Sequence, residues 1–165
     1  MTGTLLWVQE SRPPAPSITS NEALPSVTAS PSASAPVMPV PDQLAAAQAA
    51  LTRGNSYYDA QQWGQAIEQY KLVIASGGDD PNVRTDLGNA LRFNGQAQLA
   101  LQQYQIAQNQ DPSHEQSLFN QGGLWTFALH NPKKGVEAWR TYLKRFPNGH
   151  SAKDARAFIK QHERK

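Results

Sequence analysis

Few side chains in this sequence have the type and spacing that acid–base or metal chemistry needs. The adjacent carboxylates Asp79–Asp80 are followed by Pro81, which explains Asp80 as the cap of a helix. No two histidines stand four residues apart or in an HExxH context, and the four of them are His114, His130, His150 and His162. Cysteine is absent, which excludes thiolate catalysis and Cys-ligated zinc. We therefore predict that the protein is not an enzyme and that it needs no metal and no cofactor.

The charge balance argues against nucleic acid as the main partner. The chain carries 15 Lys and Arg residues against 13 Asp and Glu residues, so its formal net charge is only +2. Basic residues gather toward the C-terminus, but Glu137, Asp154 and Glu163 lie between them. This mixture is typical of an ordinary solvated face.

Two asparagines offer a different chemistry. Asn55 and Asn89 stand 34 positions apart and fall on predicted helices. An amide side chain has both a donor and an acceptor, which suits pairing with the backbone of another protein. The alternative is that both are simply solvated polar residues. Arg92, one helical turn from Asn89, could pair with a carboxylate of a partner, although a single arginine is more often a solvated surface residue.

The elements that would position these side chains follow a repeat. Gly54 is followed by Gly88, Ala66 by Ala100 and Tyr70 by Tyr104, each after 34 positions. A fixed period of this size points to an array of helical hairpins. We expect the glycines to face the alanines where two helices cross closely, with Gly54 against Ala66 and Gly88 against Ala100. The two tyrosines would fill the space between one hairpin and the next.

Capping and breaking residues divide the chain into helices. Pro41–Asp42 begins the first helix, Gly77–Gly78 ends the second, and Asp80–Pro81 opens the third. Asn94–Gly95 and Asp111–Ser113 mark further breaks. The predicted helices run over about 42–60, 63–76, 81–93 and 96–108, then from after the break at Asp111–Ser113 to the turn at His130–Pro132, from there to about 146, and finally over 151–163.

The third unit departs from the period. Gly122 keeps the 34-residue step, but the next alanine and tyrosine, Ala138 and Tyr142, come four positions late. We interpret this as an insertion of about one helical turn. The last helix, begun by a weak capping box of Ser151 and Asp154, would cover the end of the core with a charged outer face.

These residues resemble the tetratricopeptide repeat over about Leu44–Phe146. The second unit carries the pattern best, with Leu87–Gly88, Gly95, Ala100, Tyr104 and Pro112 in order. The early tryptophan of the family is missing from all three units, where Ala50, Arg84 and Leu118 stand instead. The resemblance implies an all-α right-handed superhelix of antiparallel helix pairs, divided into units of about 42–80, 81–112 and 113–148 and a capping helix over 151–163, together 42–164.

The resemblance also implies a function. In this family the first helix of each pair lines a concave groove that holds a peptide or helix of a partner protein, so we expect a non-catalytic scaffold or adaptor. The family's groove positions correspond here to Leu51, Asn55, Tyr58, Asp59, Thr85, Asn89, Arg92, Phe93, Phe119, Asn120, Gly123 and Thr126, with Phe127 nearby. The subtype that clamps a chaperone's acidic tail needs several basic residues in the groove. Only Arg92 is present, so that subtype is not expected.

The remaining expectations concern the N-terminal segment and the setting. Residues 1–41 are rich in Pro, Ser and Ala, which predicts a disordered tail or linker. Met1–Val8 lacks the cationic flank of a signal peptide, and it is either an ordinary terminus or the stub of a membrane anchor. The segment Ala138–Pro147 resembles repeat proteins of the bacterial envelope. The alternative function is therefore a self-assembling or membrane-tethered periplasmic module, in which the chain forms a homo-oligomer.

Overall fold

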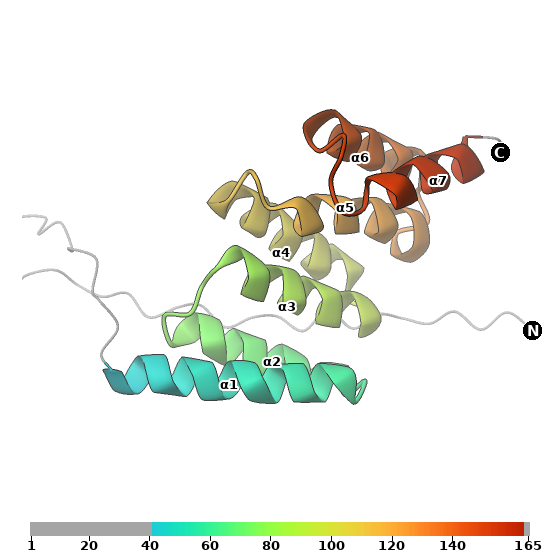
Figure 1. Ribbon diagram of the computed structural model, residues 1–165. Helices are drawn as coiled ribbons and strands as arrows, with labels where there is room; N and C mark the ends of the chain where they lie inside the picture. Colours follow the sequence, from blue (N-terminus) through green and yellow to red (C-terminus); the bar gives the residue numbers. More distant parts are fainter. Residues whose placement is uncertain (1–40, 164–165) are drawn as a thin grey trace, which may run out of the picture. The chain divides into compact units, whose positions relative to one another are not determined.

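The computed structural model describes residues 41–163, and these form an α-helical domain. The helices are α1 (Pro41–Asp59), α2 (Trp63–Ala75), α3 (Pro81–Phe93), α4 (Ala97–Gln110), α5 (Glu115–Gly123), the π-helix η1 (Leu124–Ala128), α6 (Pro132–Arg145) and α7 (Ala152–His162) (Figure 1). Their ends lie within two residues of the predicted ones, which confirms the expected all-α fold. The predicted tail and the segment Met1–Val8 lie outside the described residues, apart from Pro41.

The predicted start and stop signals act mostly as expected. The Asp80 side chain caps α3 by accepting hydrogen bonds from the backbone N–H groups of Asn82 and Val83, at 2.7 and 3.1 Å. Gly77 and Gly95 have positive φ angles of 86° and 77°, which L side chains rarely adopt. The expected capping box at Ser151 is wrong, because the Ser151 side chain makes no capping hydrogen bond.

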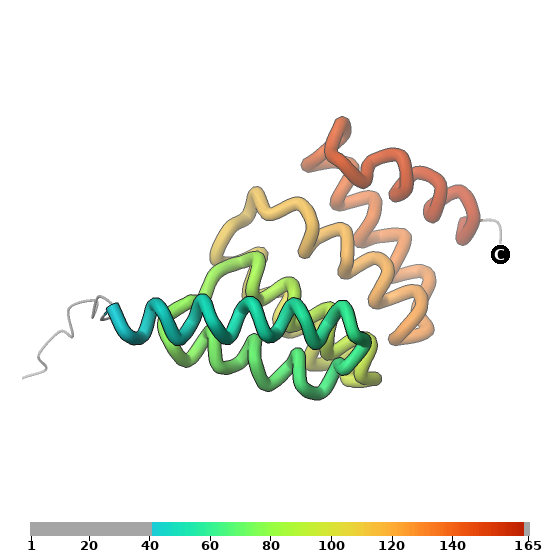
Figure 2. The backbone as a smooth tube through the Cα atoms, turned by 60° about the horizontal axis from the view of Figure 1, so that its bottom comes forward, coloured from blue at the N-terminus to red at the C-terminus, as the bar shows by residue number. Residues whose placement is uncertain are grey.

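The helices form antiparallel pairs that stack in chain order. α1 packs on α2, α3 on α4 and α5 on α6, while α2 against α3 and α4 against α5 join one pair to the next. Figure 2 shows this succession from the first pair to α7. None of the described helices is long and apolar enough to span a membrane.

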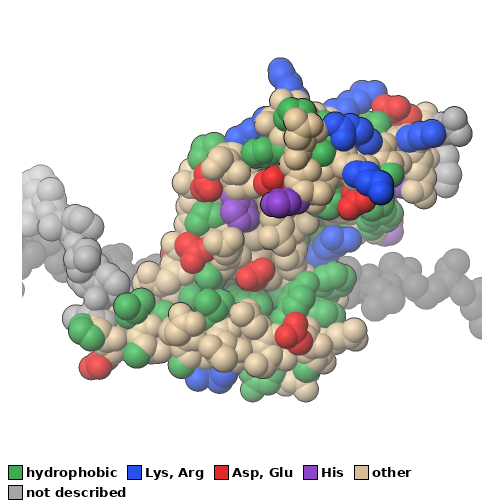
Figure 3. Space-filling view, in the orientation of Figure 1, with side chains coloured by type: hydrophobic (Ala, Val, Ile, Leu, Met, Phe, Trp, Pro, Cys, Tyr) green, Lys and Arg blue, Asp and Glu red, His purple; other side chains and the backbone are tan. Residues whose placement is uncertain are grey.

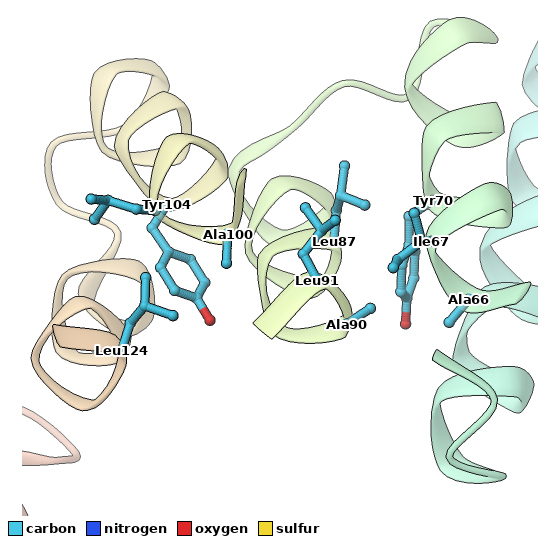
Figure 4. Packing of buried hydrophobic residues seen from close by; sticks show 10 residues of the cluster. Ala66, Ile67, Tyr70, Leu87, Ala90, Leu91, Ala100, Tyr104 and Leu124 are labelled. Atoms are coloured by element: carbon cyan, nitrogen blue, oxygen red, sulfur yellow. The ribbon is translucent and has the colours of Figure 1, made fainter. Parts of the chain in front are cut away.

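The repeated glycines make room for aromatic rings. A Cβ atom on Gly54 would lie 2.9 Å from Cε1 of Tyr70, and a Cβ on Gly88 would lie 2.5 Å from Cε1 of Tyr104. The nearest side chains are therefore the tyrosines, which corrects the expectation that these glycines face the alanines Ala66 and Ala100. In the core each tyrosine ring lies between one pair and the next (Figure 4).

The third unit contains one extra residue rather than four. Gly122 packs against the indole of Trp139 as the earlier glycines pack against tyrosine, and Gly135 packs against Thr126. Trp139 and Gly135 thus replace Tyr104 and Ala100 after 35 positions instead of 34. The predicted counterparts Ala138 and Tyr142, and the insertion of one helical turn, are wrong.

The π-helix η1 absorbs the extra residue. The N–H of Leu129 donates to the carbonyl oxygen of Leu124 at 2.9 Å, five positions earlier, so this turn holds one residue more than an α-helical turn. The widened turn restores the register between α5 and α6. The extra residue lies inside a continuous helical segment and is not marked by a glycine or proline. The spacing of glycine, alanine and tyrosine alone therefore did not reveal it.

The last helix covers the end of the core as predicted. Ala152 and Ala155 of α7 are buried, and the ring of Phe158 stacks on Trp139 with 4.7 Å between ring centroids. The outward-facing residues are exposed and include Lys153, Arg156 and Lys160. α7 therefore closes one end of the stack with a charged surface.

Candidate partner-binding face

Three helices, α1, α3 and α5, follow one another along the side of the domain that faces the viewer in Figure 1. We call this side the front face. Between these helices lie two hydroxyl groups supplied from behind by α2 and α4. The hydroxyl of Tyr70 donates to Oδ1 of Asn55 at 3.0 Å, and the hydroxyl of Tyr104 donates to Oδ1 of Asn89 at 2.7 Å. Figure 4 shows both hydroxyls pointing to the same side.

Each tyrosine marks a junction between neighbouring helices of the front face. The first junction, between α1 and α3, contains Asn55, Tyr58, Tyr70 and Asp86. The second junction, between α3 and α5, contains Asn89, Arg92, Tyr104 and Asn120. Burial of the ring is the main cause that raises the pKa of Tyr70 and of Tyr104, so both hydroxyls keep their protons at neutral pH.

The second junction is closed by polar contacts within the domain. Nδ2 of Asn120 donates to Oδ1 of Asn89 at 2.9 Å, so that oxygen accepts from both Asn120 and Tyr104. The guanidinium of Arg92 lowers the pKa of Tyr104 as a nearby positive charge and hydrogen-bond donor, against the larger effect of burial. Donors and acceptors are therefore matched within this junction.

The first junction contains an unmatched carboxylate. Asp86 is half-buried, and it forms no hydrogen bond or ion pair with any residue between 41 and 163. Burial, with a smaller contribution from the charge of Asp80, raises the pKa of Asp86 to about 6. Asp86 lies close enough to Tyr58 and Tyr70 to add to the upward shift of their pKa values, after burial. Asp86 was not among the predicted groove residues.

Beside the first junction, three aromatic rings form a partly exposed surface. Tyr58 lies edge-on to Trp63 with 5.1 Å between ring centroids, and Trp63 stacks on Phe93 at 4.9 Å. Phe93 is 51% exposed. Figure 3 shows hydrophobic side chains gathered over the C-terminal end of α3. We call Tyr58, Trp63 and Phe93 the aromatic surface. Trp63 was assigned only to the repeat pattern, although its place directly after the α1–α2 turn puts it near the end of α1.

A pocket of about 390 Å³ adjoins the aromatic surface. Arg92 and Phe93 form one side, and Phe127 of η1, which is 48% exposed, forms part of the other. The complete lining is Arg92, Phe93, Gly95, Ala97, Phe127, Ala128 and His130. The pocket extends the front face toward the third unit.

The structure separates the predicted groove residues into three groups. Exposed or half-buried on the front face are Asn55, Tyr58, Asp59, Asn89, Arg92, Phe93, Asn120 and Gly123. Leu51 and Phe119 are half-buried but pack against core clusters, Phe119 against Trp139, Tyr142 and Phe158. Thr85 and Thr126 are buried, and their hydroxyls donate to the carbonyl oxygens of Pro81 and Gly122, at 2.7 and 2.9 Å.

The place of Thr85 and Thr126 in the predicted groove is therefore wrong. Each hydroxyl is buried and donates to the carbonyl four residues earlier, within α3 for Thr85 and from η1 back to α5 for Thr126, so neither faces a partner. Between residues 41 and 163, no group of three or more His, Asp or Glu side chains is arranged to hold a metal ion.

Known proteins resemble this one in structure but not detectably in sequence. No protein-family model matches the sequence, and no curated protein sequence matches it. Solved structures do match. The TPR domain of Arabidopsis OM64 is 21% identical with a TM-score of 0.63 and covers 73% of this chain and 98% of its own. The TPR2B domain of yeast Sti1, in complex with pHsp70, is 17% identical with a TM-score of 0.66 over 73% and 98%.

The chain has the fold of a tetratricopeptide-repeat domain. A third neighbour, the second TPR domain of human RPAP3 in complex with the HSP70 peptide SGPTIEEVD, is 20% identical with a TM-score of 0.62 and covers 75% of this chain and 98% of its own. At these identities the likeness concerns the arrangement of helices. The chemistry of the front face follows from the side chains of this chain itself.

Proposed function

We propose that the protein is a non-catalytic interaction module whose front face holds a segment of a partner protein. The observation that carries this proposal is the aromatic surface. Tyr58, Trp63 and Phe93 are packed on one another, the first two half-buried and Phe93 exposed. Arg92 lies beside them, with its guanidinium carbon 5.5 Å from the centroid of the Phe93 ring. Trp, Tyr and Arg are the residue types that contribute most to binding at protein interfaces.

The neighbours support the same role through a different chemistry. The yeast Sti1 and human RPAP3 domains were solved with chaperone partners, and the RPAP3 peptide ends in the acidic sequence EEVD. The predicted groove positions together with Asp86 carry one cation, Arg92, and two carboxylates, Asp59 and Asp86. Its partner therefore differs in sequence from an acidic tail.

Affinity capture with matched variants tests the proposal. Phe93→Ser removes the most exposed ring of the aromatic surface, and Leu99→Ser makes a similar change at a 45% exposed residue of α4, away from the front face. We expect a true partner to be captured by the wild type and by Leu99→Ser but lost with Phe93→Ser. Equal capture by both variants would show that binding does not use the front face. Asn55 and Asn89 are poorer targets, because both accept hydrogen bonds from core tyrosines.

Self-assembly is the second candidate, and one feature favours it. The last helix α7 covers one end of the stack, whereas the first pair keeps apolar side chains exposed, Leu44 at 62% and Leu72 at 43%. Sedimentation at several concentrations measures this directly. A strict monomer at every concentration removes the second candidate.

The envelope setting and the membrane tether stay proposals that rest on the resemblance of Ala138–Pro147 and on the composition of residues 1–41. Fractionation of the source cells tests them. Recovery of the protein in the cytoplasmic fraction would contradict both.

A further inference from the structure

The repeat places different side chains at one position of the two junctions. Asp86 of α3 and Asn120 of α5 stand 34 positions apart, the length of the repeat. Asn120 faces the preceding front helix and donates to Asn89, which in turn accepts from Tyr104. Asp86 holds the corresponding place beside the Asn55–Tyr70 pair, and its charge acts on the Tyr70 hydroxyl.

Having aspartate at position 86 where the next repeat has asparagine changes the balance of hydrogen-bond donors and acceptors in the first junction. Asn120 brings a donor to an acceptor, whereas an ionised carboxylate at Asp86 brings only acceptors. Oδ1 of Asn55 already accepts from Tyr70, and no group from the rest of residues 41–163 donates to Asp86. Within residues 41–163 Asp86 therefore has no donor of its own, and a half-buried carboxylate in that state is unfavourable.

We propose that the first junction binds a positively charged group, the ammonium of a lysine or the guanidinium of an arginine, carried by the partner segment. This inference rests on the proposed function and names the chemistry of the partner. The cation donates to Asp86 through charge-assisted hydrogen bonds. The second junction, where Asn120 and Arg92 already supply donors, has no such requirement.

The position of the aromatic surface sets the spacing between the cation and an apolar residue in the partner segment. Asp86 and Phe93 are seven residues apart on α3, so about 10 Å of helix separates them. An extended chain covers that distance in about three residues. The partner segment therefore carries its cation about three residues from an apolar side chain that packs on Tyr58, Trp63 and Phe93.

Two peptides of opposite charge test the inference. The first is SGPTIEEVD, the peptide bound by the human RPAP3 domain. The second is the same peptide with its two glutamates and its aspartate replaced by lysine and its C-terminus amidated. NMR titration up to about 1 mM peptide detects weak binding, and the side-chain amide signals of Asn55 and Asn89 report on the two junctions. We expect the cationic peptide to bind at least about tenfold more tightly and to move the Asn55 signals.

Two variants make the result specific. Asp86→Asn keeps the shape of the side chain and should weaken the cationic peptide about tenfold while changing the acidic peptide little. Asp154→Asn removes the same charge from an exposed position on α7 and should leave both affinities unchanged.

Three outcomes overturn the inference. The first is tighter binding of the acidic peptide at the Asn55 and Asn89 signals, which leaves the proposed function intact. The second is an equal loss of affinity with Asp86→Asn and Asp154→Asn, which reduces the effect to overall charge. The third is that neither peptide moves the front-face signals at about 1 mM. The proposed function itself fails only if Phe93→Ser captures partners as well as Leu99→Ser does.

Discussion

The two junctions of the front face have the same backbone and opposite chemistry. In both, a tyrosine from the helix behind donates to an asparagine in front, at 3.0 Å in the first junction and 2.7 Å in the second. In the second, Asn120 completes the contacts, and in the first, Asp86 leaves them incomplete. A repeat thus fixes where side chains lie, while a single residue decides whether a junction is filled by the protein or open to a partner.

The glycines behind the tyrosines give the largest expected effect. A Cβ on Gly88 meets Tyr104 at 2.5 Å, and one on Gly54 meets Tyr70 at 2.9 Å. Because the ring must move further in the second junction, we expect Gly88→Ala to lower the free energy of unfolding by about 2 kcal/mol and Gly54→Ala by about 1 kcal/mol. Urea denaturation measures both.

Gly64 provides the control for these two variants. It lies in α2, and a Cβ atom added there would have nothing within 4 Å, so a methyl group fits without a clash. Gly64→Ala should therefore raise the free energy of unfolding by up to about 0.5 kcal/mol through helix propensity alone. Equal losses for Gly54→Ala and Gly88→Ala would mean that the two tyrosines are held equally tightly, and the proposed difference in packing would be wrong.

The corresponding residues Asn120 and Asp86 should respond to alanine with opposite signs. Asn120→Ala removes the donor to Asn89 at 2.9 Å and should lower the free energy of unfolding by about 1.5 kcal/mol. Asp86→Ala removes a half-buried carboxylate without a partner and should leave the stability unchanged or raise it. Thermal unfolding of the two variants at pH 7 makes the comparison, and a loss of similar size in both would contradict an open first junction.

The positions of the helices could be predicted because local signals agree with the fold. Asp80 before Pro81 and the glycines at positive φ mark helix ends whatever the tertiary contacts are. The front face was harder, because spacing alone cannot tell an accessible side chain from one that bonds to its own helix. Thr85 and Thr126 occupy groove positions by number but are buried.

The third unit shows a second limit of periodicity. Tyr142 has the expected residue type, but Trp139 fills the tyrosine position, because a π-helical turn adds one residue and not four. At the position 34 residues after Asn89, Gly123 offers no side-chain acceptor. Of the buried side-chain nitrogen and oxygen atoms in residues 41–163, Nε1 of Trp139 is the one without a hydrogen-bond partner. Residue type alone therefore pointed to Tyr142, whereas the packing shows that Trp139 occupies the tyrosine position of the third unit.

The stability gained by Asp86→Asn should depend on pH. The folded-state pKa of Asp86, about 6, lies above the ordinary value of 3.8, so ionisation opposes folding above pH 6 and this cost disappears as the pH falls toward 4. The full difference would be worth about 3 kcal/mol, which partial exposure reduces to about 1 kcal/mol. We therefore expect Asp86→Asn to be more stable than the wild type by about 1 kcal/mol at pH 7 and equally stable near pH 4.

Chemical denaturation at both pH values measures this difference, with Asp154→Asn as the control for removing one carboxylate. The same asparagine can also donate to Asn55 as Asn120 donates to Asn89, which would close the first junction. A gain that persists near pH 4 would therefore come from this new hydrogen bond rather than from the lost charge.

The smallest expected effect on stability is at the aromatic surface. Phe93 is 51% exposed, and its ring contacts Trp63 and Tyr58 with 4.9 and 6.2 Å between ring centroids. Phe93→Ala should therefore lower the free energy of unfolding by about 0.5 kcal/mol. Leu99→Ala, at a residue 45% exposed, should cost about the same. Calorimetry measures both losses and shows whether Phe93 contributes to the scaffold or is available to a partner. If Phe93→Ala costs several times more than Leu99→Ala, the ring is part of the scaffold, and its exposure then needs no partner to explain it.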